Sequence, residues 1–153
     1  MRQRPWLVAA AVAALALACA AAALAATPKP GKYRGKTSQD RSVRLKINDA
    51  GRIPRDGFKI HWQAPCQVKQ DMAWTDVTHN TRRIELEDDG SFELDAKYKH
   101  TVGDFTGHIK IETDGKFDTK TSASGTFKAR VRVTEDGDYV DTCKKTVNWS
   151  VSD

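Results

Sequence analysis

Cysteine is scarce in this sequence, and no two cysteines stand close together. The 153 residues contain three, Cys19, Cys66 and Cys143. Because there is no C-x-x-C pair, thioredoxin-like redox chemistry has no support. Histidine is also scarce: the four histidines are scattered, and none has a partner at the i,i+2 or i,i+4 spacing that favours a metal site. The sequence therefore predicts no metal and no cofactor.

A strong basic excess is missing as well. The formal net charge of the whole chain is +5, and without Arg2 and Arg4 the chain has 23 basic and 20 acidic side chains. Nucleic-acid binders usually carry a far larger excess, clustered on one element, and no motif of that kind is present. The charge argues against nucleic acid as a partner. It allows a weak attraction to anionic polymers of the cell envelope.

The longest apolar run lies at the N-terminus, where Arg2 and Arg4 precede an alanine-rich stretch that extends to residue 26. A basic start, an apolar centre and the A-x-A pattern at 23–25 predict a secretory signal peptide over residues 1–25. Two alternatives stay open: an uncleaved membrane anchor, and a lipoprotein that begins at Cys19. All three export the rest of the chain, so we expect a secreted or extracytoplasmic protein, and the leader is typical of bacteria.

After the leader we expect a linker at 26–31 and one domain at 32–153. Cys66 and Cys143 are the two cysteines that remain in this domain. In an exported domain such a pair is most economically a disulfide, with two free thiols or a redox pair as alternatives. Cys66 shares its parity with Trp62, and Cys143 shares its parity with Trp149, so both thiols are expected to point into the core.

Beyond residue 31, apolar and polar residues alternate over most of the chain, and no apolar stripe has helical spacing. A period of two is typical of half-buried β-strands. The expected strands lie at 42–47, 58–66, 84–86, 92–98, 105–111, around Phe117, 125–133 and 143–151. Asp-Gly pairs at 89–90, 114–115 and 136–137 predict hairpin turns. We predict an all-β antiparallel meander of seven to ten strands, closed as a β-sandwich or a small β-barrel with one disulfide.

Segment 67–81 is the longest stretch in which the alternation blurs, and long irregular segments on a β scaffold often carry function. It contains Trp74, which with Tyr33 and Tyr139 is one of the aromatic residues available for stacking on a ligand. The alternative interpretation of the segment is an edge strand plus a loop, with a strand around 73–77 that would bury or expose Trp74 depending on its register. Trp74 is therefore a candidate binding residue.

Basic residues at outward positions form a second candidate site. We expect them to merge into one cationic patch, although charged outer faces also keep sheet edges soluble. The residues are Arg44, Lys46, Lys128, Arg130, Arg132 and Lys144.

The remaining polar motifs are weaker. Among the acidic turns, Asp136, Asp138 and Asp141 are the best calcium candidates, but they lack EF-hand spacing and a hairpin needs Asp-Gly there in any case. No G-x-S-x-G elbow or comparable signature supports hydrolysis. We therefore predict no catalytic residues and no metal ligands.

The opening GKYRGKTSQD at 31–40, followed by RSVRLKIN, resembles a group of small secreted β domains from high-GC Gram-positive bacteria. Those domains read G-x-Y-x-G-x-T-S-Q-G, carry one cysteine after the next strand, and have a second cysteine shortly before W-[ST]. Cys66, Cys143 and Trp149 fit the later pattern, while Asp40 stands where glycine is usual. The resemblance implies a compact β domain with a Cys66–Cys143 bridge, and it implies no activity.

These observations lead to one functional hypothesis and two alternatives. We expect a secreted, non-enzymatic, monomeric domain that binds an anionic polymer or a protein of the cell envelope, and that meets a membrane only through an uncleaved leader. The first alternative is a small barrel that carries an apolar ligand. The second is a hydrolase or metal enzyme without a recognisable motif.

Overall fold

The computed structural model describes residues 27–153, and every regular element in that range is a β-strand. The strands are β1 (Gly31–Thr37), β2 (Ser42–Ile47), β3 (Phe58–Pro65), β4 (Ala73–His79), β5 (Ser91–Val102), β6 (Phe105–Thr119), β7 (Ser122–Glu135) and β8 (Asp138–Ser152). The predicted all-β antiparallel fold is confirmed. The predicted leader lies outside the described residues. Within 27–153 no helix is long and apolar enough to cross a membrane.

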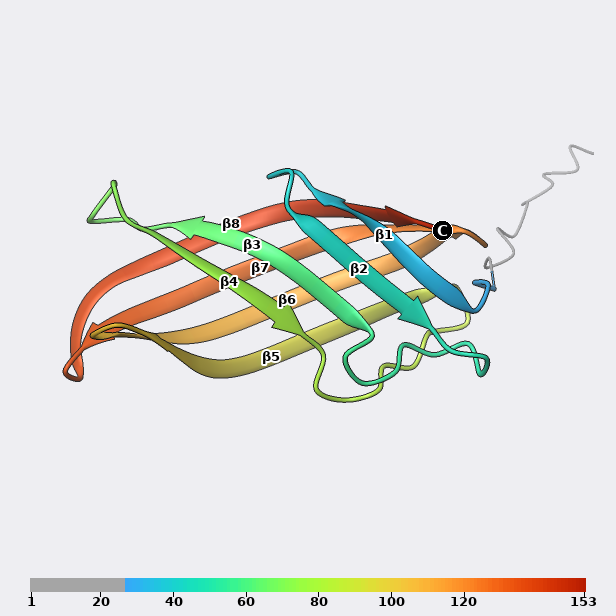
Figure 1. Cartoon of the computed structure of the whole chain (residues 1–153), viewed down its shortest axis with the longest axis horizontal. Helices are drawn as coiled ribbons and strands as arrows, with labels where there is room; N and C mark the ends of the chain where they lie inside the picture. Colours follow the sequence, from blue (N-terminus) through green and yellow to red (C-terminus); the bar gives the residue numbers. More distant parts are fainter. Residues whose placement is uncertain (1–26) are drawn as a thin grey trace, which may run out of the picture.

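The eight strands form one antiparallel sheet in the order β4-β3-β2-β1-β8-β7-β6-β5. Each strand pairs with the next one in sequence except β4, which does not pair with β5. The two halves are joined where Arg34–Thr37 of β1 pairs with Trp149–Ser152 of β8. The sheet curls into a half-barrel in which β1 to β4 cross over β5 to β8 (Figure 1). The sequence left sandwich and barrel open, and the observed closure is a single curled sheet.

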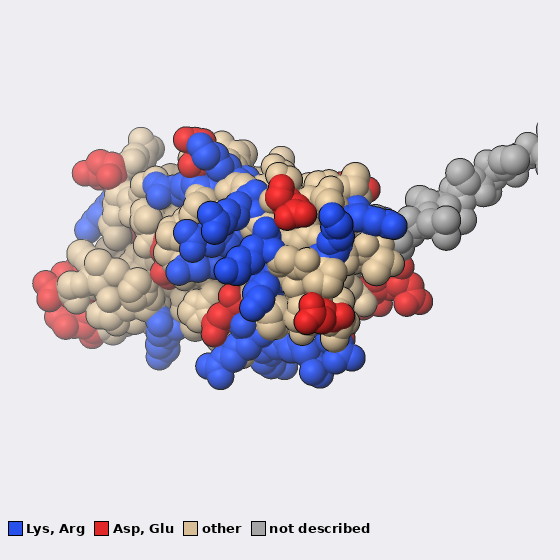
Figure 2. All heavy atoms as spheres, turned by 45° about the vertical axis from the view of Figure 1, so that its right-hand side comes forward, with Lys and Arg blue, Asp and Glu red and all other residues tan. Residues whose placement is uncertain are grey.

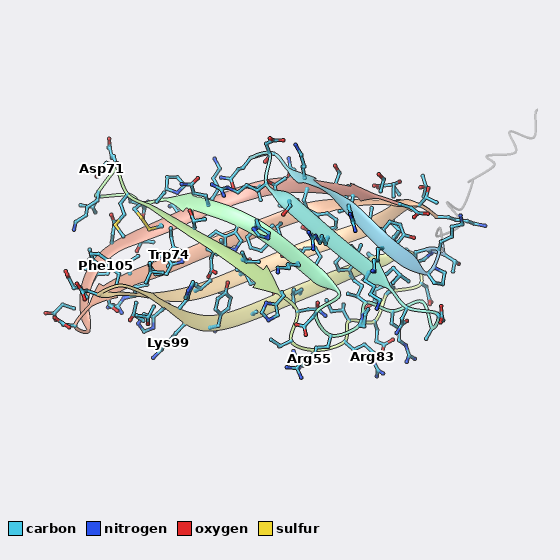
Figure 3. All side chains as sticks on the ribbon, in the orientation of Figure 1. Arg55, Asp71, Trp74, Arg83, Lys99 and Phe105 are labelled. Atoms are coloured by element: carbon cyan, nitrogen blue, oxygen red, sulfur yellow. A yellow bond between two sulfur atoms is a disulfide. The ribbon has the colours of Figure 1, made fainter. Side chains whose placement is uncertain are left out.

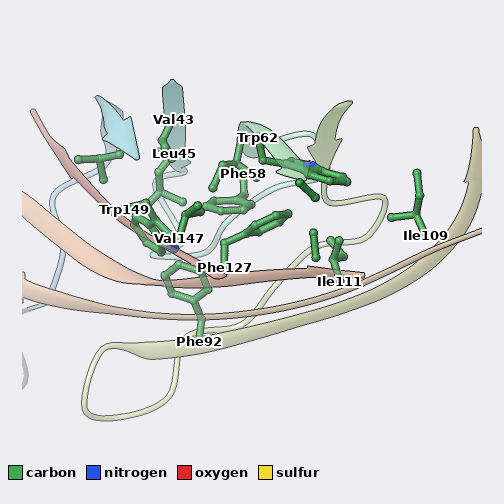
Figure 4. Close-up of a cluster of buried hydrophobic side chains, with 14 of the residues drawn as sticks. Val43, Leu45, Phe58, Trp62, Phe92, Ile109, Ile111, Phe127, Val147 and Trp149 are labelled. Carbon is green, nitrogen blue, oxygen red and sulfur yellow. The ribbon is translucent and has the colours of Figure 1, made fainter. Parts of the chain in front are cut away.

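Aromatic side chains fill the space between the two halves (Figure 4). The ring of Trp149 lies 5.5 Å from that of Phe58 and 6.0 Å from that of Phe92, measured between centroids. Trp62 packs in the same way on Phe127, at 5.7 Å. These residues occupy the inward positions of their strands, as the period of two predicts. The apolar residues that alternate with polar ones along each strand therefore pack together in one core shared by both halves.

One predicted turn is wrong, because Asp114-Gly115 lies inside β6 and the chain reverses between Thr119 and Ser122 instead. A Cβ atom at Gly115 would stand 2.4 Å from the ring of Phe92 and 2.7 Å from that of Trp149. Glycine is needed at this position to make room for two rings, not to turn the chain. The turns at 89–90 and 136–137 are confirmed, with φ of 77° at Gly90 and 91° at Gly137.

One other segment differs from expectation. Residues 84–86 were predicted as a strand, but they contribute only one isolated bridge, between Ile84 and Ile53. The bridge partner of Ile84 lies far away in the sequence, so the local pattern could not decide the outcome at 84–86. For segment 67–81 the interpretation as an edge strand plus a loop is confirmed, because β4 occupies Ala73–His79 at the edge of the sheet and a loop precedes it.

The predicted disulfide is confirmed: Cys66 and Cys143 are bonded, with an S–S distance of 1.96 Å. Cys66 follows the end of β3 and Cys143 lies within β8, two strands that are not neighbours in the sheet. The bond therefore ties the two halves of the half-barrel together on the side where β1 no longer pairs with β8.

Candidate functional site

Basic side chains gather on the outer side of β1, β2 and β3. Arg34 pairs across the strands with Arg44, and Arg44 pairs with Lys59. Lys32 is the cross-strand partner of Lys46 in the same way. We call these five residues, Lys32, Arg34, Arg44, Lys46 and Lys59, the β1–β3 basic face. Only Arg44 and Lys46 of the five were predicted from the sequence, because the register that brings the other three beside them is a tertiary property.

The charges of the β1–β3 basic face are not neutralised by neighbours. Among the residues that the structure describes, none of the five makes an ion pair, and none of the outward positions of β1 to β3 is acidic. Figure 2 shows clusters of Lys and Arg side chains on this side of the molecule, with separate acidic groups beside them. Like charges placed directly opposite each other destabilise a sheet. A row of three cations across three strands therefore opposes folding and favours contact with an anion.

The imidazole of His61, on β3, reports the positive potential of this face. Its pKa is lowered by partial burial and further by the nearby charges of Lys59, Arg44 and Arg41. A neutral histidine in this position adds no charge to the face. Because the lowering depends on those cations, an anion that binds over them should reverse part of it.

The other predicted basic residues lie on a second surface, the outer side of β7 and β8. Arg130 is the cross-strand partner of Lys144, and Lys110 of β6 pairs with Arg130 on its other side. Lys128 lies one outward position along β7, beside a surface hollow of about 500 Å³. Here acidic groups intervene, because Glu112 forms an ion pair with Lys110 at 2.6 Å. Arg132, the remaining predicted residue, stacks on the ring of Tyr139 with 5.6 Å to its centroid.

The structure does not bring the two basic groups into one row. Arg34 of the β1–β3 basic face pairs with Ser152 of β8, which pairs with Ser122 of β7. Arg130 lies eight residues further along β7, a separation of about 26 Å at 3.3 Å per residue. Uncharged outward residues of β8 lie between the groups. The β1–β3 basic face, which has a single sign of charge, is the stronger candidate.

Trp74 is not available for stacking on a ligand, and this part of the prediction was wrong. Its side chain is only 4% exposed, and it packs against Gly107 of β6, where a Cβ atom would stand 2.5 Å from the indole. Tyr33 is buried as well, whereas Tyr139 is 53% exposed. β4 is an edge strand, but the curl of the sheet lays its inward side chains on β6 (Figure 3).

Beside Trp74, a polar network closes the seam between β4 and β5, which share no backbone pairing. The hydroxyl of Tyr98 lies 2.8 Å from Thr78 Oγ1 and 3.3 Å from Asp76 Oδ2. The other oxygen of Asp76 lies 3.2 Å from Nδ1 of His100. Burial raises the pKa of Tyr98, and the nearby carboxylate of Asp76 raises it further. The tyrosine stays protonated and acts as a structural donor.

The acidic turn residues do not converge on a common point. Within 27–153, no three His, Cys, Asp or Glu side chains are grouped as metal ligands would be. Asp141 is fully buried, and its carboxylate accepts hydrogen bonds from the backbone N–H groups of Val68, Lys69 and Thr142, at 3.1, 2.8 and 2.6 Å. Gln67 N–H also donates to it, at 3.2 Å. The carboxylate thus holds the β3–β4 loop.

These hydrogen bonds set the ionisation of Asp141. Desolvation raises the pKa of the carboxyl, but the four backbone N–H donors together outweigh it and lower the pKa below its usual value. A lowered folded-state pKa means that the ionised form stabilises the fold. That contribution is complete above the pKa of an unfolded aspartate, about 3.9, and is lost as the pH falls through the folded-state value.

We expect Asp141→Asn to release the β3–β4 loop, because an amide accepts on one oxygen only and places an NH₂ against backbone donors. Hydrogen exchange at the amides of Val68 and Lys69 should be at least about tenfold faster. The matched control is Asp138→Asn, an exposed residue of the same hairpin. Exchange as slow in Asp141→Asn as in the control would contradict the role of the carboxylate.

The interior offers no support for a bound apolar ligand. The largest core side chains, among them Trp62, Phe58 and Phe127, are less than 2% exposed. Trp62 packs on Phe127, and Phe58 packs on Trp149. A hollow of about 750 Å³ is a surface cleft, between β5 and residues 81–87. Nothing in the described residues favours the carrier alternative over binding on an outer face.

Comparison with protein-family models, with curated proteins and with solved structures finds no match in any of the three. The resemblance to small secreted domains of high-GC Gram-positive bacteria therefore stays a prediction. Function has to be argued from the surface itself.

Proposed function

We propose that this domain is a non-enzymatic, extracytoplasmic binding module for an anionic polymer of the bacterial cell envelope, and that the β1–β3 basic face is its binding surface. The single observation that carries the proposal is the row Arg34, Arg44 and Lys59, three cations side by side without an acidic neighbour on their strands. The expected export of the chain supports the location, because a leader of this type directs a protein out of the cytoplasm.

The geometry of the face suits a polymer better than a small anion. Cations on neighbouring strands are separated by about 4.8 Å, and those two positions apart on one strand by about 6.6 Å. The side chains stand on an open, convex surface, so a single small anion would remain hydrated and weakly held. A chain that repeats its negative charge every few ångströms would contact several cations at once and gain from their sum.

Binding is expected to weaken when Arg44 and Lys46 are both changed to glutamate. The double variant reverses two charges at the centre of the face, so affinity for long-chain polyphosphate at low salt should fall at least about tenfold. Titration calorimetry of the mature domain measures the change. Wild-type affinity should also fall steeply with added salt, because exposed charges are screened.

The matched control is Lys128→Glu with Arg130→Glu, which makes the same change in charge on the outer side of β7. Its affinity should stay within a few-fold of wild type, and uncharged dextran should not bind either protein. The pKa of His61, followed by NMR, should rise when polyphosphate binds, because the anion offsets Lys59 and Arg44. Equal losses in both double variants, or an unchanged His61, would mean that binding is non-specific or located elsewhere.

A further inference from the structure

The edge of β5 that faces away from β6 has no strand partner, although the side chains of Tyr98 and His100 contact β4. The strand is 12 residues long and pairs with β6 alone. The cleft of about 750 Å³ beside it is lined by seven consecutive residues, Ser91 to Lys97. Successive side chains of a strand point to opposite faces, so a cleft on one face would be lined by every second residue. A cleft lined by consecutive residues therefore runs along the edge of the strand. Residues 81–87 form the far wall, and their one backbone hydrogen bond to β5 in the described chain joins Glu87 N–H to the carbonyl of Ser91.

The outward side chains of β5 have an unusual order of charge. Glu93 and Asp95 come first, and Lys97 and Lys99 follow, with Ala96 at the centre of the four. All four charged residues are exposed, and none makes an ion pair within residues 27–153. Figure 3 shows Lys99 projecting away from the barrel. In the reverse direction along the strand, the order of charge is two positive residues followed by two negative residues. A second copy that runs antiparallel therefore presents the opposite sign at each position.

The residues of β6 directly opposite three of these charges carry the same sign. Glu93 is the cross-strand partner of Asp114, and Asp95 is the partner of Glu112. Lys97 in turn pairs with Lys110. Like charges placed directly opposite each other destabilise a sheet. Three consecutive outward positions of β5 therefore lie beside a like charge on β6. On the edge away from β6 they border the cleft.

We propose that two copies of this chain associate through antiparallel pairing of their β5 edges, centred on Ala96. In that register Asp95 lies opposite Lys97 of the second copy, and Glu93 lies opposite Lys99 of the second copy. Two-fold symmetry repeats both pairs, so four ion pairs form. Parallel, in-register pairing would place like charges together and is disfavoured. The charge order thus selects one orientation and one register.

The inward side chains are compatible with the same register. Ala96 meets its own copy at the two-fold axis, where a small side chain permits close approach. Leu94 lies opposite Tyr98 of the second copy, and both are half-buried in the single chain, so pairing covers apolar surface that is now partly exposed. The strand of the second copy would enter the cleft beside residues 81–87.

The usual function of charges on a free edge is to prevent pairing, and that explanation predicts a different pattern. Charges protect an edge against its own copy most directly when they are of one sign, since two copies then repel each other. β5 carries both signs in an order that attracts its own copy in antiparallel orientation. The dimer departs from the monomer that we expected from sequence, and it does not depend on the proposed function of the β1–β3 basic face.

Two complementary double variants test the dimer by sedimentation equilibrium of the mature domain. Glu93→Lys with Asp95→Lys makes the edge wholly basic, and Lys97→Glu with Lys99→Glu makes it wholly acidic. Each variant alone should self-associate at least about tenfold more weakly than wild type. An equimolar mixture of the two should recover a dimer, because every pair is again of opposite sign. Wild-type dimerisation should weaken as salt is added.

Several results would overturn the proposal. A wild-type protein that stays monomeric at sub-millimolar concentration and low salt does so directly. So does a mixture of the two variants that stays monomeric while each variant retains the wild-type circular dichroism spectrum and melting temperature. A third variant, Arg44→Glu with Lys46→Glu, should dimerise like wild type. Loss of dimer there would place the contact on the β1–β3 basic face.

Discussion

Replacing Cys66 and Cys143 together with alanine is expected to lower the free energy of unfolding by about 4 kcal/mol. The two cysteines are 77 residues apart, so the bond removes a large amount of freedom from the unfolded chain. The bond also links the two halves of the sheet, whose only shared strand pairing is the short one between β1 and β8. Most small domains have a free energy of unfolding of about 5–15 kcal/mol, so this loss would be a large fraction of the total.

Urea unfolding of a protein consisting of residues 27–153 measures the effect of the disulfide. Wild-type protein unfolded in the presence of a reductant provides the control, because it loses the bond without any change of side chain. The two preparations should lose similar stability. A reduced wild-type protein that unfolds at the same urea concentration as the oxidised protein would show that the disulfide adds no stability beyond the β1–β8 pairing and the shared core.

Replacing Trp149 with alanine is the second large effect, with an expected loss of about 3–5 kcal/mol. The indole is 2% exposed and contacts both Phe58 of β3 and Phe92 of β5. It therefore joins strands from both halves of the half-barrel. Its Nε1 has no hydrogen-bond partner in the described chain, so the loss comes from packing and from the cavity that remains.

Tyr139→Ala is the matched control, since it removes an aromatic ring from an exposed position of the same strand. Its free energy of unfolding should stay within about 0.5 kcal/mol of wild type. Urea unfolding compares the two variants under the same conditions. Equal losses in both would mean that the rings of Trp149, Phe58 and Phe92 do not form the junction between the halves.

Both expectations depend on inward positions that the sequence identified correctly. The alternation placed Phe58, Phe92 and Trp149 in the core, because a strand has a period of two whatever its partners are. The Asp-Gly turns at 89–90 and 136–137 were also found, since a tight hairpin requires φ above zero at specific positions. These properties are local, and a single sequence expresses them in full.

The errors have a common origin in contacts between distant segments. Gly115 was taken for a turn residue because its two packing partners, Phe92 and Trp149, lie in other strands. Trp74 was expected at a binding surface because nothing near it in the sequence shows that Gly107 leaves space for its ring. In each case a glycine in one strand and a large ring in another form a single structural unit. Only the folded sheet brings them together.

The candidate site divides in the same way. The outward parity of Arg44 and Lys46 was visible in the sequence, but Lys32, Arg34 and Lys59 join them only through the register of β1 and β3. Register depends on which residues are paired between strands, and alternation within one strand contains no information about it. The same limit applies to Arg130 and Lys144, which are cross-strand neighbours although they are 14 residues apart in the chain.

By itself, the sequence determined that this domain is an antiparallel β protein with a disulfide and an alternating core, because strand periodicity, turn chemistry and cysteine number are local or compositional. The tertiary structure decided how the sheet closes, which cations share a face, and which edge is left free. Those properties follow from register and from the curl of the sheet. They arise only when residues far apart in the chain are placed side by side.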